Sequence, residues 1–192
     1  RDVLGSRGLG DVYKRQNSGM ITSNYWLSEV YDAQITNAHK NGDLYIHNIN
    51  MLTGCSAGWS LENLILKGLP SVNKMISSLP AKHLSTLCNQ MVNFLGIMQN
   101  EWASAQSFAH FDTLLVPFIH QDKLSVKMVS DCLESFIYGI NIPSRWGTQA
   151  PFSQITLDWN VPQEFINKKA IVAGCECDFT YGDCQKEMKI LH

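Results

Sequence analysis

The sequence predicts an α/β fold in which amphipathic helices alternate with short strands. Apolar residues recur at helical spacing over about 81–99 and again over about 125–139. Residues 152–159 alternate apolar and polar side chains, which is typical of a strand, and 44–47 form a shorter strand candidate. Because helices and short strands alternate, we expect a mixed architecture rather than a helix bundle.

The first two predicted helices begin at residues that cap helices well. Ser23 or Asn24 can cap a helix that ends at Asn41-Gly42. Ser60 can cap a second helix, which ends near residues 68–70.

Two longer helices have one apolar face each. The face expected over 81–99 comprises Leu84, Leu87, Met91, Phe94, Leu95 and Met98. The residues expected to be buried over 125–139, which begins at Ser125, are Val126, Val129, Leu133, Phe136 and Ile137.

Composition limits the class of protein. The 192 residues are 45% hydrophobic and 17% charged, with a net charge of -2. This balance suits one globular domain and offers no basic face for nucleic acid. The apolar runs are too short for a membrane span, and no signal peptide precedes the body. We therefore expect neither nucleic acid nor a membrane as a partner.

Six cysteines lie at positions 55, 88, 132, 175, 177 and 184. A chain of this size and class favours reduced thiols, and hence the cytoplasm, over a disulfide framework. Cys88 and Cys132 fall within helical patterns, so we expect them in the core.

Residues 1–16 differ from the rest of the chain. They are rich in Gly and Arg and lack an amphipathic period. We interpret them as a disordered or foreign leader, outside the folded part of residues 17–192.

The stretch Gly54-Cys55-Ser56-Ala57-Gly58-Trp59 places a thiol beside a hydroxyl among small residues. It follows the strand candidate, so the thiol can face a ligand pocket. A lone Cys is more often a small buried hydrophobic residue, and both interpretations stay open.

Three other segments carry polar candidates. Residues 100–106 either line a cleft or form a helix cap and solvated loop. The loop 145–153 either presents N–H groups to a phosphate or is a plain turn, and it lacks a P-loop's Gly-Lys-Ser/Thr element. His47 is either a base or substrate contact, or a structural residue bonded to the backbone.

Cys175, Cys177 and Cys184 suggest a metal site at first sight. Structural zinc sites use paired Cys-x-x-Cys elements, and a fourth ligand at ordinary spacing is absent. A surface hairpin with incidental thiols is the favoured alternative.

Several of these segments, taken in order over residues 17–188, resemble the anaerobic (class III) ribonucleoside-triphosphate reductases, which are glycyl-radical enzymes. The segments that carry the resemblance are Gly42–His47, Ala57–Leu61, Asn93–Gly96, Gln99–Trp102, Phe111–Leu114, Pro143–Gln149 with Pro151-Phe152, and Thr180–Asp183.

The resemblance implies a ten-stranded α/β barrel, of which this chain is a helix-rich part: the N-terminal part of the catalytic domain, over 17–192. It implies an oxidoreductase that reduces ribonucleoside triphosphates at the ribose 2′ position and so supplies deoxyribonucleotides for DNA replication. A glycyl radical near the family's C-terminus forms a thiyl radical on a loop cysteine, which removes the 3′ hydrogen. A second thiol on a barrel strand then supplies reducing equivalents, with formate or a redoxin-type donor completing the cycle.

The resemblance also assigns residues. The family has Tyr-Cys before Ala-Gly-Trp, so Ser56 occupies the position of the strand thiol and Cys55 that of the Tyr. Serine cannot perform the redox step, so Cys55 is our candidate catalytic thiol, although in a regular strand it would point away from the substrate unless a bulge re-aims it. The residues assigned to substrate binding are His47, Asn100, Glu101 and Gln149, and none is assigned to a metal.

Other positions depart from the family pattern. Asn48 replaces an Asp, and Ala150 and Gln154 replace a Thr and an Asn. Each change alters a hydrogen-bonding group near the expected pocket.

The implied cofactors lie outside this chain: the glycyl radical, installed by an activase that uses an iron–sulfur cluster and S-adenosylmethionine, and a zinc site. The implied partners are the substrate, dNTP and ATP effectors, the activase and a second copy of the chain. As an internal fragment, the chain alone is expected to be inactive. The alternative function is a non-catalytic α/β nucleotide-binding or dimerisation module.

Overall fold

A computed structural model describes residues 3–69, 77–102, 104–142 and 150–192. In chain order its elements are α1 (Val3–Tyr25), the π-helical turn η1 (Trp26–Val30), α2 (Ala33–Asn41), β1 (Ala57–Trp59), α3 (Leu61–Lys67), α4 (Leu84–Met98), β2 (Gln106–Phe108), α5 (Phe111–Asp122), α6 (Val126–Ile140), β3 (Ser153–Ile155), α7 (Gln163–Ile166), β4 (Lys169–Val172), β5 (Cys175–Thr180), the 3-10 turn η2 (Gly182–Cys184) and α8 (Met188–Leu191).

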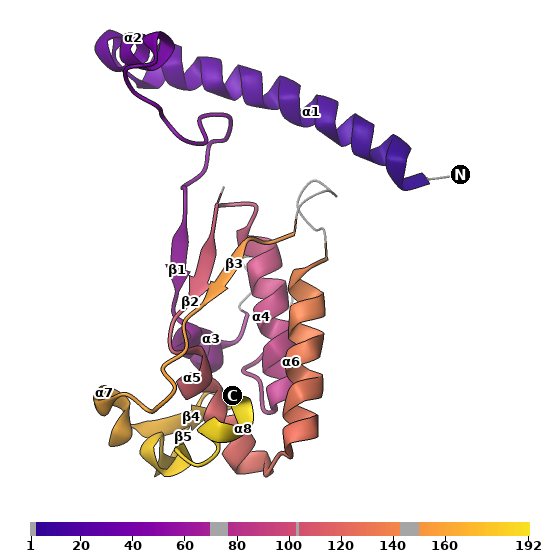
Figure 1. Ribbon diagram of the computed structural model, residues 1–192, viewed down its shortest axis with the longest axis vertical. Coiled ribbons are helices and arrows are strands. Elements are labelled where there is room, and N and C mark those ends of the chain that lie inside the picture. Colours follow the sequence, from indigo (N-terminus) through magenta and orange to yellow (C-terminus); the bar gives the residue numbers. More distant parts are fainter. Residues whose placement is uncertain (1–2, 70–76, 103, 143–149) are drawn as a thin grey trace.

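A parallel sheet with the strand order β1-β2-β3 lies along one side of the body, next to α4 (Figure 1). In register, Gly58 pairs with Ser107, which pairs with Gln154. Parallel neighbours need long crossovers, and the helices α3–α4 and α5–α6 supply them. The α/β class is therefore confirmed. The sheets described here have three and two strands, so they do not establish a ten-stranded barrel.

Helix α4 packs on one face of this sheet. The Phe94 ring contacts the rings of Trp59 and Phe108 at centroid distances of 5.3 and 5.8 Å. Gln106, which is fully buried on that face, donates from Nε2 to the Leu95 carbonyl at 3.1 Å. Helix α6 lies beside α4 (Figure 1), and the pair approaches so closely that a Cβ at Gly139 would lie 2.7 Å from Val92 Cγ2.

The helices with clear local signals form where the sequence predicts them. Ser60 caps α3 by accepting a hydrogen bond from the Asn63 N–H, and Ser125 caps α6 by accepting from the Met128 N–H. Within α6, Val129 and Phe136 are buried as expected, but Val126 and Ile137 are exposed. The apolar face of α6 is therefore wider than its buried stripe.

The segment after Ser23 is not one continuous helix. Asp32 has an extended backbone and accepts the Ile35 N–H on its side chain, so it caps a new helix, α2, after η1. This local side-chain bond competes with continuation of the helix. Helix α2 ends at Gly42, which has a φ of 86° as expected of a glycine cap.

The strand predicted over 44–47 is wrong. The N–H groups of Asp43 and Leu44 return to the Ala38 carbonyl, and the Ile46 N–H donates to His39 Nδ1. These bonds tie the segment back to α2, and a turn follows over 47–50. The predicted strand over 152–159 is shorter than expected, because β3 ends at Ile155.

The leader also differs from expectation, because residues 3–16 belong to α1 rather than lacking regular structure. Helix α1 projects away from the body (Figure 1). It contacts the following turn where a Cβ at Gly19 would lie 3.1 Å from Asn50 Cβ. Whether these residues are foreign stays a prediction.

Helix α5 is a long element that the sequence analysis did not predict. In α5, all nine residues from Phe111 to Ile119 are buried. Because this helix is apolar on every side, it has no amphipathic period by which to recognise it. None of the helices described here combines the length and apolar character that crossing a bilayer requires.

Two of the three C-terminal thiols, Cys175 and Cys177, lie on the hairpin that the favoured interpretation predicted. Strand β5 begins at Cys175 and pairs antiparallel with β4, whereas Cys184 is buried in η2. Among the described residues, no three His, Cys, Asp or Glu side chains gather in a way that could hold a metal ion.

Candidate functional site

Cys55 and Ser56 lie immediately before β1, and both side chains are exposed. The backbone here is held by the neighbouring strand. The Cys55 carbonyl accepts the Ser104 N–H at 2.6 Å, and the Ala57 N–H donates to the Ala105 carbonyl at 3.0 Å.

The pairing register shifts at Cys55. Gly54 pairs with Trp102, whereas Ala57 pairs with Gln106, so two residues lie between these pairs on one strand and three on the other. An irregularity of this kind changes the direction of nearby side chains. The extra residue belongs to the neighbouring strand, so it does not by itself re-aim Cys55, and the direction of this thiol stays a prediction.

The Cys55 sulfur has two polar neighbours. Asn48 Nδ2 and Ser56 Oγ each lie 3.7 Å from Sγ, and both act as donors. Asn48 has a φ of 54°, in the left-handed region that Asn tolerates better than most residues. The turn after α2, not a strand, thus brings a side chain to the thiol.

Gly54 is required by close packing. A Cβ built at this position would lie 2.2 Å from Cζ3 of Trp102. Trp102 itself packs edge-on against Trp59 at 5.8 Å, so its ring cannot move freely.

We therefore expect Gly54→Ala to lower the free energy of unfolding by about 1–3 kcal/mol through overpacking. The measurement is the urea midpoint. Gly58→Ala is the matched control, because a Cβ there would meet only Ser107 Oγ at 3.5 Å. Equal midpoint shifts in the two variants would show that the Trp102 contact is not the cause.

The sheet face opposite α4 carries small and polar residues. Gly58, Ser107 and Gln154 stand side by side across the three strands, with Gly58 and Gln154 exposed and Ser107 half-buried. No described helix covers these three residues. Because Gly58 has no side chain, a ligand can approach its backbone closely. The Ser107 hydroxyl and the Gln154 amide beside it can form hydrogen bonds with a polar ligand.

The other predicted site residues lie in different settings. His47 is exposed in the turn before Cys55, and its ring is edge-on to Tyr45 at 4.8 Å. The Asn100 amide donates to the Gly96 and Ile97 carbonyls, so it caps α4 as the simpler interpretation held. Glu101 is exposed, next to the residue that pairs with Gly54. Gln149 and most of the loop 145–153 lie outside the described residues.

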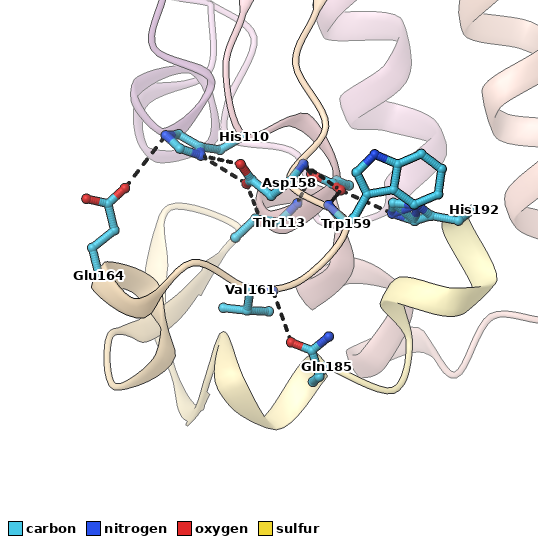
Figure 2. A network of polar contacts seen from close by, with 9 residues as sticks. His110, Thr113, Asp158, Trp159, Val161, Glu164, Gln185 and His192 are labelled. Atoms are coloured by element: carbon cyan, nitrogen blue, oxygen red, sulfur yellow. Dashed lines mark hydrogen bonds and ion pairs between the residues drawn. The ribbon is translucent and has the colours of Figure 1, made fainter.

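A second polar cluster, which the sequence reasoning missed, occupies the carboxyl ends of β2 and β3 (Figure 2). Its centre is Asp112, which is fully buried. The carboxylate accepts hydrogen bonds at 2.9–3.0 Å from the backbone N–H groups of Thr113, Asp158 and Trp159. His192 Nε2 lies 3.1 Å from the same carboxylate.

Asp158 extends this cluster toward the surface. Its carboxylate lies 2.9 Å from His110 Nδ1 and accepts the Thr113 hydroxyl at 2.6 Å. On the other side of the ring, His110 Nε2 lies 3.8 Å from Glu164, on α7 (Figure 2). The cluster thus fastens the chain after β3 to the start of α5. Its only sequence signal was a carboxylate beside a continuous apolar run.

The thiols divide by exposure. Burial raises the pKa of Cys88 and of Cys184 to about 12, and desolvation also raises the pKa of Cys132 and Cys177. A thiol with a raised pKa holds little of the reactive thiolate at neutral pH. Cys55 and Cys175 are the exposed thiols of the six, and they lie in different parts of the fold.

Comparison with known proteins identifies related chains. A sequence model of the family described as anaerobic ribonucleoside-triphosphate reductase matches residues 11–192. A search of curated proteins finds no match.

Solved structures share the fold. The anaerobic ribonucleotide reductase from Thermotoga maritima in complex with dATP and CTP has a TM-score of 0.67 and 21% identity, covering 97% of this chain and 32% of that chain. The same enzyme with dATP bound in the specificity site gives 0.68 at 19% identity, over 97% and 32%. With MES in the active site it gives 0.73 at 21% identity, over 94% and 33%. The chain thus spans about a third of the length of these structures.

Proposed function

The chain belongs to the family of anaerobic ribonucleoside-triphosphate reductases, and we propose that it forms the N-terminal part of the catalytic domain of such an enzyme. The whole enzyme reduces ribonucleoside triphosphates to deoxyribonucleoside triphosphates, in the cytoplasm. The observation that supports this most is the exposed Cys55 two residues before β1, the strand whose Gly58 belongs to the open polar face of the sheet.

The role of Cys55 is to supply reducing equivalents. Removal of the 2′ hydroxyl as water and its replacement by hydrogen consume two electrons and two protons. In net terms both electrons come from the external reductant: a dithiol becomes a disulfide, or formate becomes carbon dioxide. The Cys55 thiol passes one hydrogen to the nucleotide and is restored to the thiol by that reductant, so Cys55 is unchanged at the end of a turnover. A glycyl radical outside this chain, installed by an activase that uses an iron–sulfur cluster and S-adenosylmethionine, supplies the radical chemistry that makes the 2′ hydroxyl a leaving group.

The protein's own contribution is to hold the ribose and to exclude competing reactions. Gly58 allows close approach, and Ser107 and Gln154 offer a hydroxyl and an amide on the same face. In the chain, His47 comes shortly before β1 and Glu101 shortly before β2. These two residues, with Asn100 and Gln149, remain our candidates for substrate contacts.

The partners of the whole enzyme are the substrate, dNTP and ATP effectors, the activase and a second copy of the chain. Exposed apolar residues in and just after α6 support association, because Val126 and Tyr138 in this helix are 64% and 70% exposed and Ile142, which follows it, is 61% exposed. This surface is also what favours the second candidate function, a non-catalytic dimerisation module.

The experiment compares this 192-residue chain with the full-length enzyme under anaerobic conditions, each with the activase, a ribonucleoside triphosphate and formate or a dithiol. We expect deoxyribonucleotide from the activated full-length enzyme and none from the chain alone, because the radical source lies outside it. Chromatography of the nucleotides measures the product, and full-length enzyme without activase is the control. Product from the chain alone would contradict the proposal, as would no product from the activated enzyme with either reductant.

A further inference from the structure

Asn48 reaches the Cys55 sulfur from a turn that does not need its side chain. The turn over 47–50 is closed by the Met51 N–H, which donates to the Asn48 carbonyl at 3.1 Å. Trp26 Nε1 fastens the same turn by donating to the Met51 carbonyl at 2.9 Å. Since these bonds hold the turn, the Asn48 amide is left for its contact with Sγ at 3.7 Å.

The two hydrogen bonds to the Cys55 sulfur have the same direction. Asn48 Nδ2 and Ser56 Oγ both donate, so Sγ is the acceptor in each. The hydrogen of the Cys55 thiol is then not used within the protein by either contact. A donor beside sulfur also stabilises a negative charge on it, whereas a carboxylate at the same place would repel that charge.

We propose that Asn48 is a positioning residue for Cys55: its amide fixes the sulfur as a hydrogen-bond acceptor and leaves the thiol hydrogen for a bound ligand. This inference rests on the proposed function, in which Cys55 is the reducing thiol. This role explains why residue 48 is an amide rather than a carboxylate.

The test uses thiol reactivity of the 192-residue chain, which needs no enzymatic activity. The variants are Asn48→Asp and Asn48→Gly, because Asp and Gly also tolerate a φ of 54°. Each protein is treated with iodoacetamide, or with the anionic iodoacetate, at pH 7.5, and alkylation of each cysteine is followed by peptide mass spectrometry. Thiolate is the reacting form, so the rate at Cys55 reports the groups beside its sulfur.

We expect Asn48→Asp to slow iodoacetamide at Cys55 by about threefold or more, and iodoacetate by a larger factor. Asn48→Gly should slow both reagents equally and by less, because it removes the donor without adding a charge. A residue that only shaped the turn would leave both rates at Cys55 unchanged in Asn48→Gly, because Gly keeps the same backbone conformation. The exposed Cys175 is the reference and should react at an unchanged rate in every variant.

Asn50→Asp is the matched control, because it adds the same charge to the same turn without a contact to the sulfur. Alkylation of the buried Cys88 and Cys184 reports unfolding, and if Asn48→Asp unfolds the chain, the loss of rate in Asn48→Gly decides the question. An unchanged Cys55 rate in Asn48→Asp, or an equal decrease in Asn50→Asp, would overturn the inference. Neither result depends on whether the full-length enzyme makes deoxyribonucleotides, so the proposed function can fail or hold separately.

Discussion

Replacing Cys55 by serine in the full-length enzyme should lower deoxyribonucleotide formation at least about a thousandfold, as expected when a residue that takes part in the chemistry is removed. The substitution exchanges one atom and keeps the size of the side chain. A hydroxyl cannot replace the thiol, because its O–H bond is too strong to give a hydrogen atom and it forms no disulfide. The measurement is the rate of product formation after activation, with the radical content of each preparation recorded so that failed activation is not mistaken for lost chemistry.

The neighbouring residue supplies the matched comparison. Ser56→Ala should keep most of the activity, since the hydroxyl only donates to the Cys55 sulfur at 3.7 Å. Cys55→Ser combined with Ser56→Cys moves the thiol to the position where the family resemblance places it. If this exchange restores the rate, the thiol acts from either position; full activity of Cys55→Ser alone would remove Cys55 from the mechanism.

Local signals explain which parts of the fold the sequence predicted. Ser60 and Ser125 cap helices through residues three positions away, so their effect is visible in a short window. The apolar face of α4 repeats within its own length for the same reason. In contrast, α5 is buried on every side, so the pattern that marks a helix is absent there.

The turn before Cys55 shows how a short window can mislead. Residues 44–47 have the composition of a strand, but the Ala38 carbonyl and His39 ring bind their backbone groups and remove them from any sheet. The contact between Asn48 and Cys55 follows from this turn. No reading of 44–47 as a strand could have predicted it.

The cluster around Asp112 depends on contacts between distant positions. The Asp158 and Trp159 N–H groups come from 46 and 47 residues further along the chain. Such a pairing becomes visible only once β2 and β3 are neighbours in the sheet. The sequence shows an acidic residue within an apolar run, and the fold shows why burying it is tolerated: every donor around it points at the carboxylate.

Asp112→Ala is expected to lower the free energy of unfolding by about 3–5 kcal/mol. The substitution leaves the backbone N–H groups of Asp158 and Trp159 without their acceptor, and it leaves His192 beside a cavity. For a domain of this size, that loss corresponds to a decrease in Tm of roughly 6–20 °C. Urea and thermal unfolding measure it, and loss of protection from hydrogen exchange at Asp158 and Trp159 would locate it.

Asp112→Asn separates the charge from the shape. The amide keeps the volume and one acceptor oxygen, but its NH₂ group then faces donors that the second carboxylate oxygen accepted, at 2.9–3.0 Å. We therefore expect most of the loss to remain. Asp122→Ala is the control, because Asp122 pairs with a His83 side chain that is 64% exposed and should cost less than about 1 kcal/mol. If Asp112→Ala cost no more than this control, the buried carboxylate would not be what fastens the end of β3 to α5, and the loop after β3 would have to be held by its apolar contacts.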